Sequence, residues 1–259
     1  MNTIKKFTGI FMLSLIALLS SCDFDGICTQ GTGPLVTDTL QIASFTGIEL
    51  STSADVYISK GATQLVEVRG QQNLIDILET DVTSDVWKID FPGCVRNMDD
   101  LEIYITLPEL TYAKISGSGN IVGQDTFSTS LMELKISGAG DISLEAIATQ
   151  LDVKISGSGN MILGMDTDQL TSEINGAGDL YLQGTAETHY SLVRGSGNIE
   201  AFDLVTDHFE VKISGAGDAE VTANLQLDVN ISGSGNVYYK GNPAINADIK
   251  GSGHLQDAN

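Results

Sequence analysis

The sequence predicts an all-β protein folded as a right-handed parallel β-helix, a solenoid in which successive coils of chain stack on one another. The first observation is a repeated motif: Gly-x-Gly followed by Asn, Asp or, once, His occurs eight times. Successive motifs begin 21, 19, 19, 19, 20, 18 and 18 residues apart, and a fixed period near 19 is typical of a solenoid. The second observation is that apolar and polar residues alternate on both sides of every motif, as they do in β-strands. The motifs begin at Gly117, Gly138, Gly157, Gly176, Gly195, Gly215, Gly233 and Gly251.

Equivalent positions of the repeats hold residues of the same type. The position two residues before each motif holds only isoleucine or valine, from Ile115 to Ile249, and β-branched residues favour buried strands. The position four residues after each first glycine is always apolar, from Ile121 to Leu255. Coils stacked about 4.8 Å apart would build a core about 35 Å long, with right-handed connections as the default. An antiparallel meander of hairpins is the alternative, but it would not place the same residue type at the same point in every repeat.

The Gly-x-Gly-Asn/Asp motif is interpreted as a structural corner between two strands. Glycine adopts positive φ without steric cost, and Asn or Asp tolerates the left-handed region and bonds the turn backbone. Stacked carboxylates would repel one another by about 1 kcal/mol for each neighbouring pair in water. Alternating Asn with Asp separates the charges and lets each amide donate to a carboxylate. The predicted ladder consists of Asn120, Asp141, Asn160, Asp179, Asn198, Asp218 and Asn236.

Calcium binding is the functional alternative for these corners. Gly-x-Gly-x-Asp repeats of the toxin type bind calcium between coils, but they recur about every nine residues. Here the period is twice as long and the second half-site is missing. Calcium also needs about six to eight oxygen ligands. We therefore expect no cofactor, with calcium as the alternative.

The chain divides into four segments. Residues 1–21 are expected to be a lipoprotein signal peptide, and residues 22–38 lack periodicity and are expected to be a tether. Residues 39–110 form a β-rich section with short alternating strands, and residues 111–259 form the β-helix repeats.

Two local features are predicted within the β-rich section. Lys60-Gly61 is expected to be a hairpin turn between strands at Val56–Ser59 and Thr63–Arg69. Asn73–Glu79 is expected to be the one short helix.

The N-terminus predicts export and lipid anchoring. Two lysines precede an apolar run from Phe7 to Leu19, as in a secretory signal. Leu-Ser-Ser-Cys, ending at Cys22, resembles the cleavage site of bacterial lipoproteins. The resemblance implies cleavage before Cys22 and lipid on its thiol and new amino group. An ordinary signal peptide with a chance cysteine is the alternative.

The other two cysteines are Cys28 and Cys94. Two cysteines in an exported protein are candidates for a disulfide. The bond requires their Cα atoms to approach within about 7 Å, which the sequence leaves open.

The chain is strongly acidic. It contains 34 acidic and 13 basic residues, a formal charge of −21, and loss of the signal peptide with its two lysines lowers this to −23. Such a charge repels nucleic acids and bare anionic lipid, so neither is expected as a partner. It suits a solvated surface protein or a binder of cations.

No catalytic or metal-binding motif is recognisable. The three histidines are scattered, and His189 falls at a predicted inward position. Some parallel β-helices are polysaccharide lyases or hydrolases, which need clustered ionisable residues on one face. The nearest candidates, Asp99, Asp100 and Glu102, precede the repeats and are expected to cover a solvated loop. Acid–lysine pairs two residues apart are expected to form a weak surface ladder: Glu133 with Lys135, Asp152 with Lys154, and Glu210 with Lys212.

The order of several short motifs resembles that of a known family. These are Phe45-Thr-Gly-Ile-Glu-Leu, Ala54-Asp-Val-Tyr-Ile-Ser-Lys-Gly, Val66-Glu-Val-Arg-Gly, Asn73-Leu, Trp87-Lys-Ile-Asp, Ile105-Thr-Leu-Pro and Ile115-Ser-Gly-Ser-Gly-Asn. Over about residues 38–255 the chain resembles the putative auto-transporter adhesin head GIN domain family of bacterial exported and lipid-anchored proteins. The resemblance implies a β-helical fold and a surface role in adhesion, and it supplies no catalytic residues.

These features predict a non-enzymatic, lipid-anchored protein of the bacterial outer membrane or cell surface. Its expected partners are the membrane, through the lipid, and a glycan or a surface protein, which the solenoid would bind as an adhesin does. A structural or self-assembling envelope module that forms homo-oligomers is the first alternative, because solenoid ends expose strand edges. A polysaccharide-active β-helix enzyme is the second.

Overall fold

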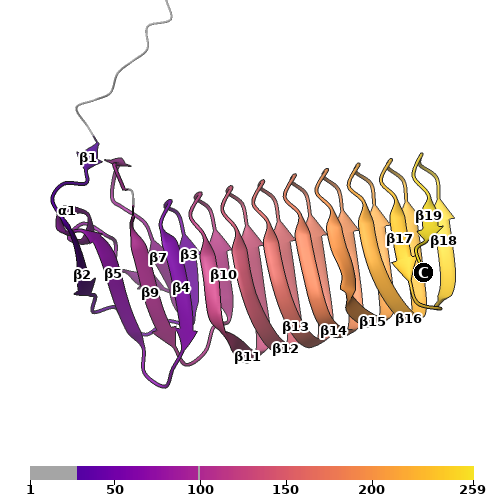
Figure 1. The fold of residues 1–259 in the computed structure, drawn as a ribbon, viewed down its shortest axis with the longest axis horizontal. Coiled ribbons are helices and arrows are strands. Elements are labelled where there is room, and N and C mark those ends of the chain that lie inside the picture. Colours follow the sequence, from indigo (N-terminus) through magenta and orange to yellow (C-terminus); the bar gives the residue numbers. More distant parts are fainter. Residues whose placement is uncertain (1–27, 99) are drawn as a thin grey trace, which may run out of the picture.

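The protein is a β-solenoid of about eight turns with one short helix, and most of its residues lie in β-strands. The computed structural model describes residues 28–98 and 100–259. The coils stack along one axis, and the corners form a single row along one edge of the rod (Figure 1). The prediction of a parallel β-solenoid from the repeat is therefore confirmed.

Each central coil is one long strand that bends in its middle. The pairing with the neighbouring coils continues on both sides of the bend, where two consecutive residues are exposed, such as Asp168 and Gln169. The strands pair in parallel with their neighbours. They are β11 (Ile121–Ile136), β12 (Ile142–Ile155), β13 (Met161–Ile174), β14 (Leu180–Val193), β15 (Ile199–Ile213) and β16 (Ala219–Ile231).

The bend divides every coil between two sheets. We call sheet A the part that follows a corner, such as residues 161–167, and sheet B the part that precedes the next corner, such as residues 169–174. The last full coil is split into β17 (Val237–Lys240) in sheet A and β18 (Ala244–Ile249) in sheet B, and β19 (Leu255–Asp257) ends sheet A.

The core lies between the two sheets. The β-branched row that precedes the corners is fully buried from Ile115 to Ile231, and its last member, Ile249, is 40% exposed. Ile249 belongs to β18, the last strand of sheet B, so no further coil covers it.

The N-terminal section continues the solenoid, but its coils are not stacked in chain order. One coil consists of β3 (Gly47–Leu50) and β4 (Asp55–Lys60), and another of β7 (Val86–Ile89) and β9 (Glu102–Leu107). The coil formed first in the chain is the inner one, because β3 pairs in parallel with both β7 and β10 (Tyr112–Ile115). In the same way, β4 lies between β9 and β11.

The predicted hairpin at Lys60-Gly61 is wrong. Strand β5 (Leu65–Gln71) follows β4 in the chain, but β9 lies between the two. Strand β9 pairs in parallel with β4 and antiparallel with β5, so Lys60 faces Leu107 and Leu65 faces Thr106. A strand from a distant part of the sequence thus takes the place that the local turn signal assigned to β5.

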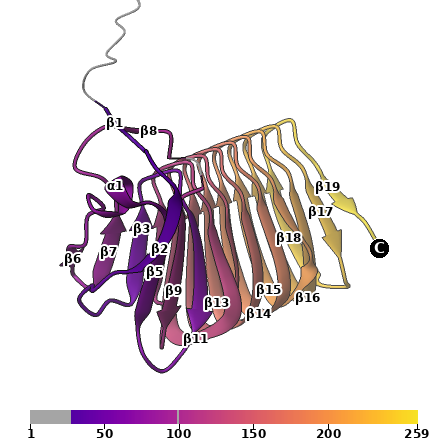
Figure 2. The same cartoon turned by 60° about the vertical axis from the view of Figure 1, so that its left-hand side comes forward.

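Antiparallel strands close the N-terminal end (Figure 2). Strand β5 pairs antiparallel with β2 (Leu35–Thr39), and β6 (Val82–Thr83) pairs antiparallel with β7. Helix α1 spans only Gln72–Ile75, shorter than the predicted 73–79. The segment expected to be a tether contains β2 and β1 (Thr29–Gln30), and β1 pairs in parallel with β8 (Val95–Arg96). Nowhere in residues 28–98 and 100–259 is there a helix with the length and apolar character needed to span a membrane.

Candidate functional site: a groove across sheet A

The corner glycines are required for close stacking of the coils. A Cβ atom added to Gly140 would lie 1.7 Å from the carbonyl oxygen of Gly119, and one added to Gly159 would lie 1.9 Å from that of Gly140. Positive φ occurs at Gly33, Gly184 and Gly241 among the described glycines, none of which is in a corner. The expectation that the corner glycines adopt positive φ is therefore wrong, and the physical reason for glycine is the carbonyl of the preceding coil.

The Asn/Asp residues of the corners form a column of hydrogen bonds between coils. The Asn120 Oδ1 accepts a hydrogen bond from the Asp141 amide at 3.0 Å, and the Asp141 Oδ1 accepts one from the Asn160 amide at 2.6 Å. The Asn198 side chain also donates through Nδ2 to Asp179, at 3.0 Å. The same amide-to-Oδ1 contact recurs through Asp179, Asn198, Asp218, Asn236 and His254. These side chains are occupied in joining coils, so the column is a structural element.

The column has one member that the sequence reasoning missed. The Asn120 Nδ2 donates to the Asp55 Oδ1 at 2.8 Å, so Asp55 continues the alternation one coil further toward the N-terminus. Ala54-Asp55-Val56 has the order small residue, Asp, apolar residue that is found at the end of each Gly-Ala-Gly-Asp corner. That order was the available signal.

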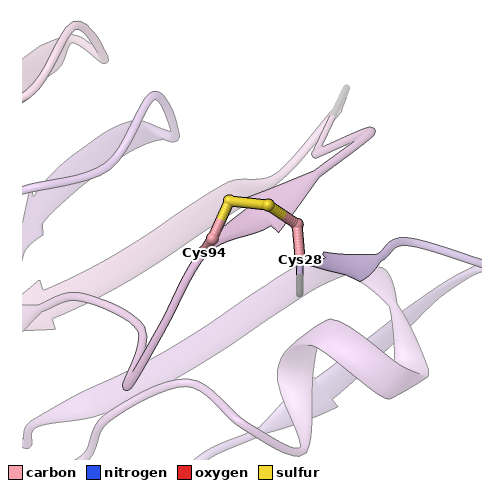
Figure 3. The surroundings of a disulfide bond; sticks show 2 residues. All are labelled: Cys28 and Cys94. Carbon is pink, nitrogen blue, oxygen red and sulfur yellow. A yellow bond between two sulfur atoms is a disulfide. The ribbon is translucent and has the colours of Figure 1, made fainter. Parts of the chain in front are cut away.

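Cys28 and Cys94 are joined by a disulfide, with their Cα atoms 4.5 Å apart (Figure 3). The bond lies immediately before β1 and β8, the two strands of the small parallel sheet. It closes a loop of 66 residues that contains the antiparallel strands and α1. Cys22 lies outside the described residues.

His189 is a core residue of sheet B. Its side chain is 1% exposed, its Nε2 lies 2.8 Å from the Ser172 Oγ, and Ser172 donates to the Ser191 Oγ at 2.9 Å. Nδ1 has no hydrogen-bond partner among the described residues. Burial lowers the pKa of His189 to about 3. The imidazole is therefore neutral and inaccessible to a ligand.

The carboxylates singled out before the repeats are not gathered into a site. Glu102 accepts hydrogen bonds from Arg69 and from the Tyr104 hydroxyl, both at 2.8 Å, and Arg69 lowers its pKa. Asp100 adopts a positive φ of 66°, and Asp99 lies outside the described residues.

The outer face of sheet B carries ion pairs. Lys135 pairs with Glu133 and Lys212 with Glu210, as predicted from their spacing. Lys154, however, pairs with Glu173 of the next coil at 2.9 Å instead of Asp152. Glu173 also contacts Arg194 and accepts a hydrogen bond from Asn175, and together with Lys154 these neighbours lower its pKa to about 2. The paired charges on this face therefore neutralise one another.

The outer face of sheet A is irregular. Val122 pairs with Ser143 and Thr126 pairs with Glu145, so β11 holds two more residues than β12 at this point. Farther along, β15 holds one more residue than β14, which places Phe202 in a bulge. These insertions account for the two longest repeats, of 21 and 20 residues. Both bulges lie beside a groove.

The groove runs across sheet A from β11 to β17. It consists of three adjoining hollows of about 410, 550 and 330 Å³, and Gln183 lines all three. Its centre is Gly164, which lies between Glu145 and Gln183 on the neighbouring strands. A Cβ at Gly164 would lie 3.2 Å from the Glu145 Cγ and 3.3 Å from the Gln183 Nε2, so the missing side chain forms a notch.

Apolar and aromatic surface is exposed in the groove. Ile162 is 51% exposed and Ile147 is 48% exposed. Tyr181 lies beside Glu200 of the next strand, and the charge of Glu200 raises the pKa of the tyrosine. The Lys240 ammonium lies 4.2 Å from the centroid of the Phe202 ring. The groove can therefore offer both apolar contact and hydrogen bonds.

The groove is negatively charged. Lys240 is the one basic residue among the described residues that line it. In the described ranges 28–98 and 100–259, no three His, Cys, Asp or Glu side chains are placed to hold a metal ion. The carboxylates that line the groove are Asp125, Glu145, Asp166, Glu200, Asp203 and Glu220.

This groove was not predicted from the sequence. The available signals were the uneven repeat lengths and a glycine, Gly164, at an outward position where the neighbouring repeats have Glu145 and Gln183. Neither signal shows that the residues adjoin, because that depends on the register between coils.

The protein is therefore a stacked β-solenoid with an open groove on one outer face. The model of the family described as "Putative auto-transporter adhesin, head GIN domain" matches residues 44–243, and the chain belongs to this family. The resemblance inferred from the short motifs is thereby confirmed.

Three solved structures of similar chains come from Parabacteroides. A putative adhesin from Parabacteroides merdae is 26% identical, with a TM-score of 0.86 over 90% of this chain and 100% of that one. A putative adhesin from Parabacteroides distasonis is 27% identical, with a TM-score of 0.85 over 89% and 99%. A protein from P. distasonis described as a putative lipid binding protein is 28% identical, with a TM-score of 0.84 over 89% and 99%. No curated protein matches the sequence.

Proposed function

We propose that this protein is an exported, lipid-anchored protein of the bacterial outer membrane or cell surface that binds a ligand without catalysis. The observation that carries the binding role is the groove across sheet A, an open channel on an otherwise regular solenoid. The family and the similar structures, which are described as adhesins, support a surface-binding role.

The anchor would hold the N-terminal end of the solenoid near the membrane. Cys22 follows a secretory signal, and Cys28 lies six residues later. Six residues span at most about 20 Å, so a lipid on Cys22 keeps the disulfide close to the bilayer surface. The disulfide with Cys94 is consistent with an oxidising, extracytoplasmic compartment. In this arrangement the groove faces sideways along the rod.

Lipid anchoring is tested by replacing Cys22 with alanine in the full chain. The unaltered protein should incorporate a labelled fatty acid and partition into detergent, and Cys22→Ala should lose the label and remain soluble. Cys28→Ala serves as the control, because that cysteine is in the disulfide. Fatty-acid label retained by Cys22→Ala would disprove the anchor.

The binding role is tested by coating beads with the mature protein and measuring their retention on host-matrix glycoproteins and on polysaccharides. The assay is run with and without calcium. Retention on one of these surfaces supports the proposal. Beads that adhere to none of them in either condition would refute the binding role.

Two observations favour other functions. At the C-terminal end, Ile245 and Ile249 of β18 are 43% and 40% exposed, which suits self-assembly through an open strand edge. However, Asp257 lies at the core-facing position paired with Tyr239, and an inward charge on an edge strand opposes such pairing. Light scattering at high concentration distinguishes these outcomes, because a strictly monomeric protein counts against self-assembly.

The carboxylates of the groove favour the enzyme alternative. Glu145, Asp166 and Asp203 line the same hollow, and glycoside hydrolases act through paired carboxylates. Glu145 and Asp166 each accept a hydrogen bond from a threonine hydroxyl, at 2.9 and 2.8 Å. Both bonds join neighbouring coils and engage one oxygen of each carboxylate. Release of new reducing ends or unsaturated sugars from a bound polysaccharide would establish the enzyme function.

A further inference from the structure

We infer that the groove across sheet A binds a polysaccharide chain that lacks acidic groups and lies along the axis of the solenoid. The inference rests on the proposed function, since it names the ligand class of that same groove. It is carried by the shape of the groove, its charge, its apolar floor and its unpaired polar groups.

The shape of the groove fits an extended polymer. Its three hollows adjoin one another and cross the strands from β11 to β17, because residues of β11 line one end and Lys240 lines the other. Six strand spacings of about 4.8 Å give a length of roughly 29 Å. The groove stays open along this length, so the middle of a long chain can enter without an end being threaded.

The charge of the groove selects against anionic polymers. Six carboxylates line it and Lys240 is the one basic side chain among its described residues. A uronic acid, a sulfated sugar or a phosphate-bearing polymer would be repelled. Hydroxyl groups, in contrast, donate hydrogen bonds to carboxylates, so a hydroxyl-rich chain without acidic groups fits this lining.

The apolar floor fits the C–H faces of sugar rings. Tyr181 lies on β14 directly beside Glu200 of β15, close enough for the charge of the carboxylate to raise the pKa of the tyrosine. Tyr181 and Glu200 line the same hollow, so the ring forms part of the groove surface. Ile162, the neighbour of Tyr181 on β13, is 51% exposed and extends this apolar strip. Aromatic rings of this kind combine apolar contact with a polar edge.

Polar groups at the centre of the groove are available to a ligand. The Gln183 amide, which can both donate and accept, makes no side-chain hydrogen bond with any of the described residues, and neither does the Asp203 carboxylate. They lie on adjacent strands, since Gln183 pairs with Asp203. The Gly164 notch beside Gln183 allows a ring to approach the backbone there. Free hydrogen-bonding groups beside an exposed apolar strip are what a specific polar ligand requires.

Two groove variants and one matched control test the inference in the mature chain. Tyr181→Ala removes the ring from the groove. Gly164→Gln fills the notch with a long side chain like that of Gln183 on the next strand. Tyr190→Ala is the control, because Tyr190 is also on β14 but lies on the outer face of sheet B, against Lys212. Circular dichroism and thermal unfolding establish that each variant is folded.

Binding is measured by affinity electrophoresis against dextran, mannan, xylan, chitosan and alginate. At least one uncharged polysaccharide should retard the unaltered protein, and alginate should not. Tyr181→Ala and Gly164→Gln should each weaken that binding about tenfold or more, whereas Tyr190→Ala should leave it unchanged.

Several outcomes overturn the inference. These are binding that both groove variants leave intact, binding to alginate alone, and binding to chitosan alone that disappears at about 0.5 M salt. A protein that binds none of the polysaccharides but still adheres to matrix proteins overturns the polysaccharide ligand and leaves the proposed function standing. A protein that binds neither class of surface overturns both.

Discussion

The corner edge and the outer face of sheet A use glycine for opposite purposes. Gly159, in a corner, lies against the carbonyl of Gly140, and an added Cβ would lie 1.9 Å from that oxygen. Gly164, five residues later in the same coil, lies between the long side chains of Glu145 and Gln183. The nearest atoms to a Cβ added there all belong to these side chains and not to the backbone. The corner glycine allows the preceding coil to approach closely, and the groove glycine leaves an open notch on the outer face of sheet A.

The same contrast holds for the regularity of the two regions. The corners repeat without interruption and their Asn/Asp column satisfies its own hydrogen bonds from coil to coil. The outer face of sheet A departs from the repeat through bulges in β11 and β15, and the groove lies there. In this solenoid, conformity to the repeat builds the fold, and departures from it create the candidate binding surface.

The largest effect is expected at the corner. Gly159→Ala should destabilise the protein by more than about 4 kcal/mol, because neither the Cβ nor the backbone carbonyl can move away without separating two coils. Urea unfolding followed by circular dichroism measures the loss. Ser158→Ala is the matched control, since alanine occupies that corner position in other repeats, and it should change stability by less than about 0.5 kcal/mol. Near-normal stability of Gly159→Ala would contradict the role assigned to stacking.

The next largest effect is expected from acid, in the interior of sheet B. His189 has a pKa of about 3 in the folded protein against 6.5 for the free side chain. Between these values the unfolded chain binds a proton that the folded chain excludes, so stability should fall as the pH falls, by up to about 1.4 kcal/mol per pH unit.

The variant His189→Leu tests this assignment. Leucine is the residue at the paired position of β13, Leu170, and Ser172 keeps its bond to Ser191. Denaturant unfolding at pH 7, 5.5 and 4 should show a much smaller slope in the variant. Glu173, whose pKa in the folded protein is about 2, causes a separate loss of stability at lower pH, and the variant should retain that loss. An unchanged slope above pH 4.5 would rule out His189 as its source.

A smaller effect is expected from the Asn/Asp column. Asn160→Asp keeps the oxygen that accepts the Asp179 amide but places three carboxylates in adjacent coils. The two new carboxylate pairs should together cost about 2 kcal/mol at low salt and less at about 1 M salt, where charges are screened. Ser158→Asp adds the same charge at the exposed tip of the corner and serves as control. Equal losses for Asn160→Asp at both salt concentrations would contradict charge separation as the reason for the alternation.

The smallest effect, and one of opposite sign, is expected in the groove. Gly164→Ala should stabilise the protein by about 0.5 kcal/mol, because glycine within a strand loses more conformational freedom on folding than alanine does. The nearest atoms to the new Cβ belong to the flexible side chains of Glu145 and Gln183, which can move. Thermal unfolding of Gly164→Ala and Gly159→Ala under the same conditions compares the two glycines directly. A loss comparable to that of the corner variant would show that Gly164 is also a packing glycine.

Much of the fold could be predicted because the same local sequence pattern occurs eight times. Alternation, the β-branched row and the fixed spacing identified strands, corners and stacked coils. The N-terminal section lacks this repetition, and there the local turn signal at Lys60-Gly61 was misleading, since β9 comes from over 40 residues later to lie between β4 and β5. Corner glycines were identified correctly as essential but for the wrong reason, because a clash with another coil is invisible in a single repeat.

The sequence by itself determined the solenoid, its period, and the residues that face inward, because each depends on local alternation and on one motif. The tertiary structure alone decided which coils adjoin, that Asp55 extends the column, that Cys28 meets Cys94, and that Gly164, Gln183 and the two bulges form one groove. The physical reason is register. Contacts between coils join residues that are far apart in the sequence, such as Gln226 and Ala244, and a bulge in one coil shifts all the partners that follow it.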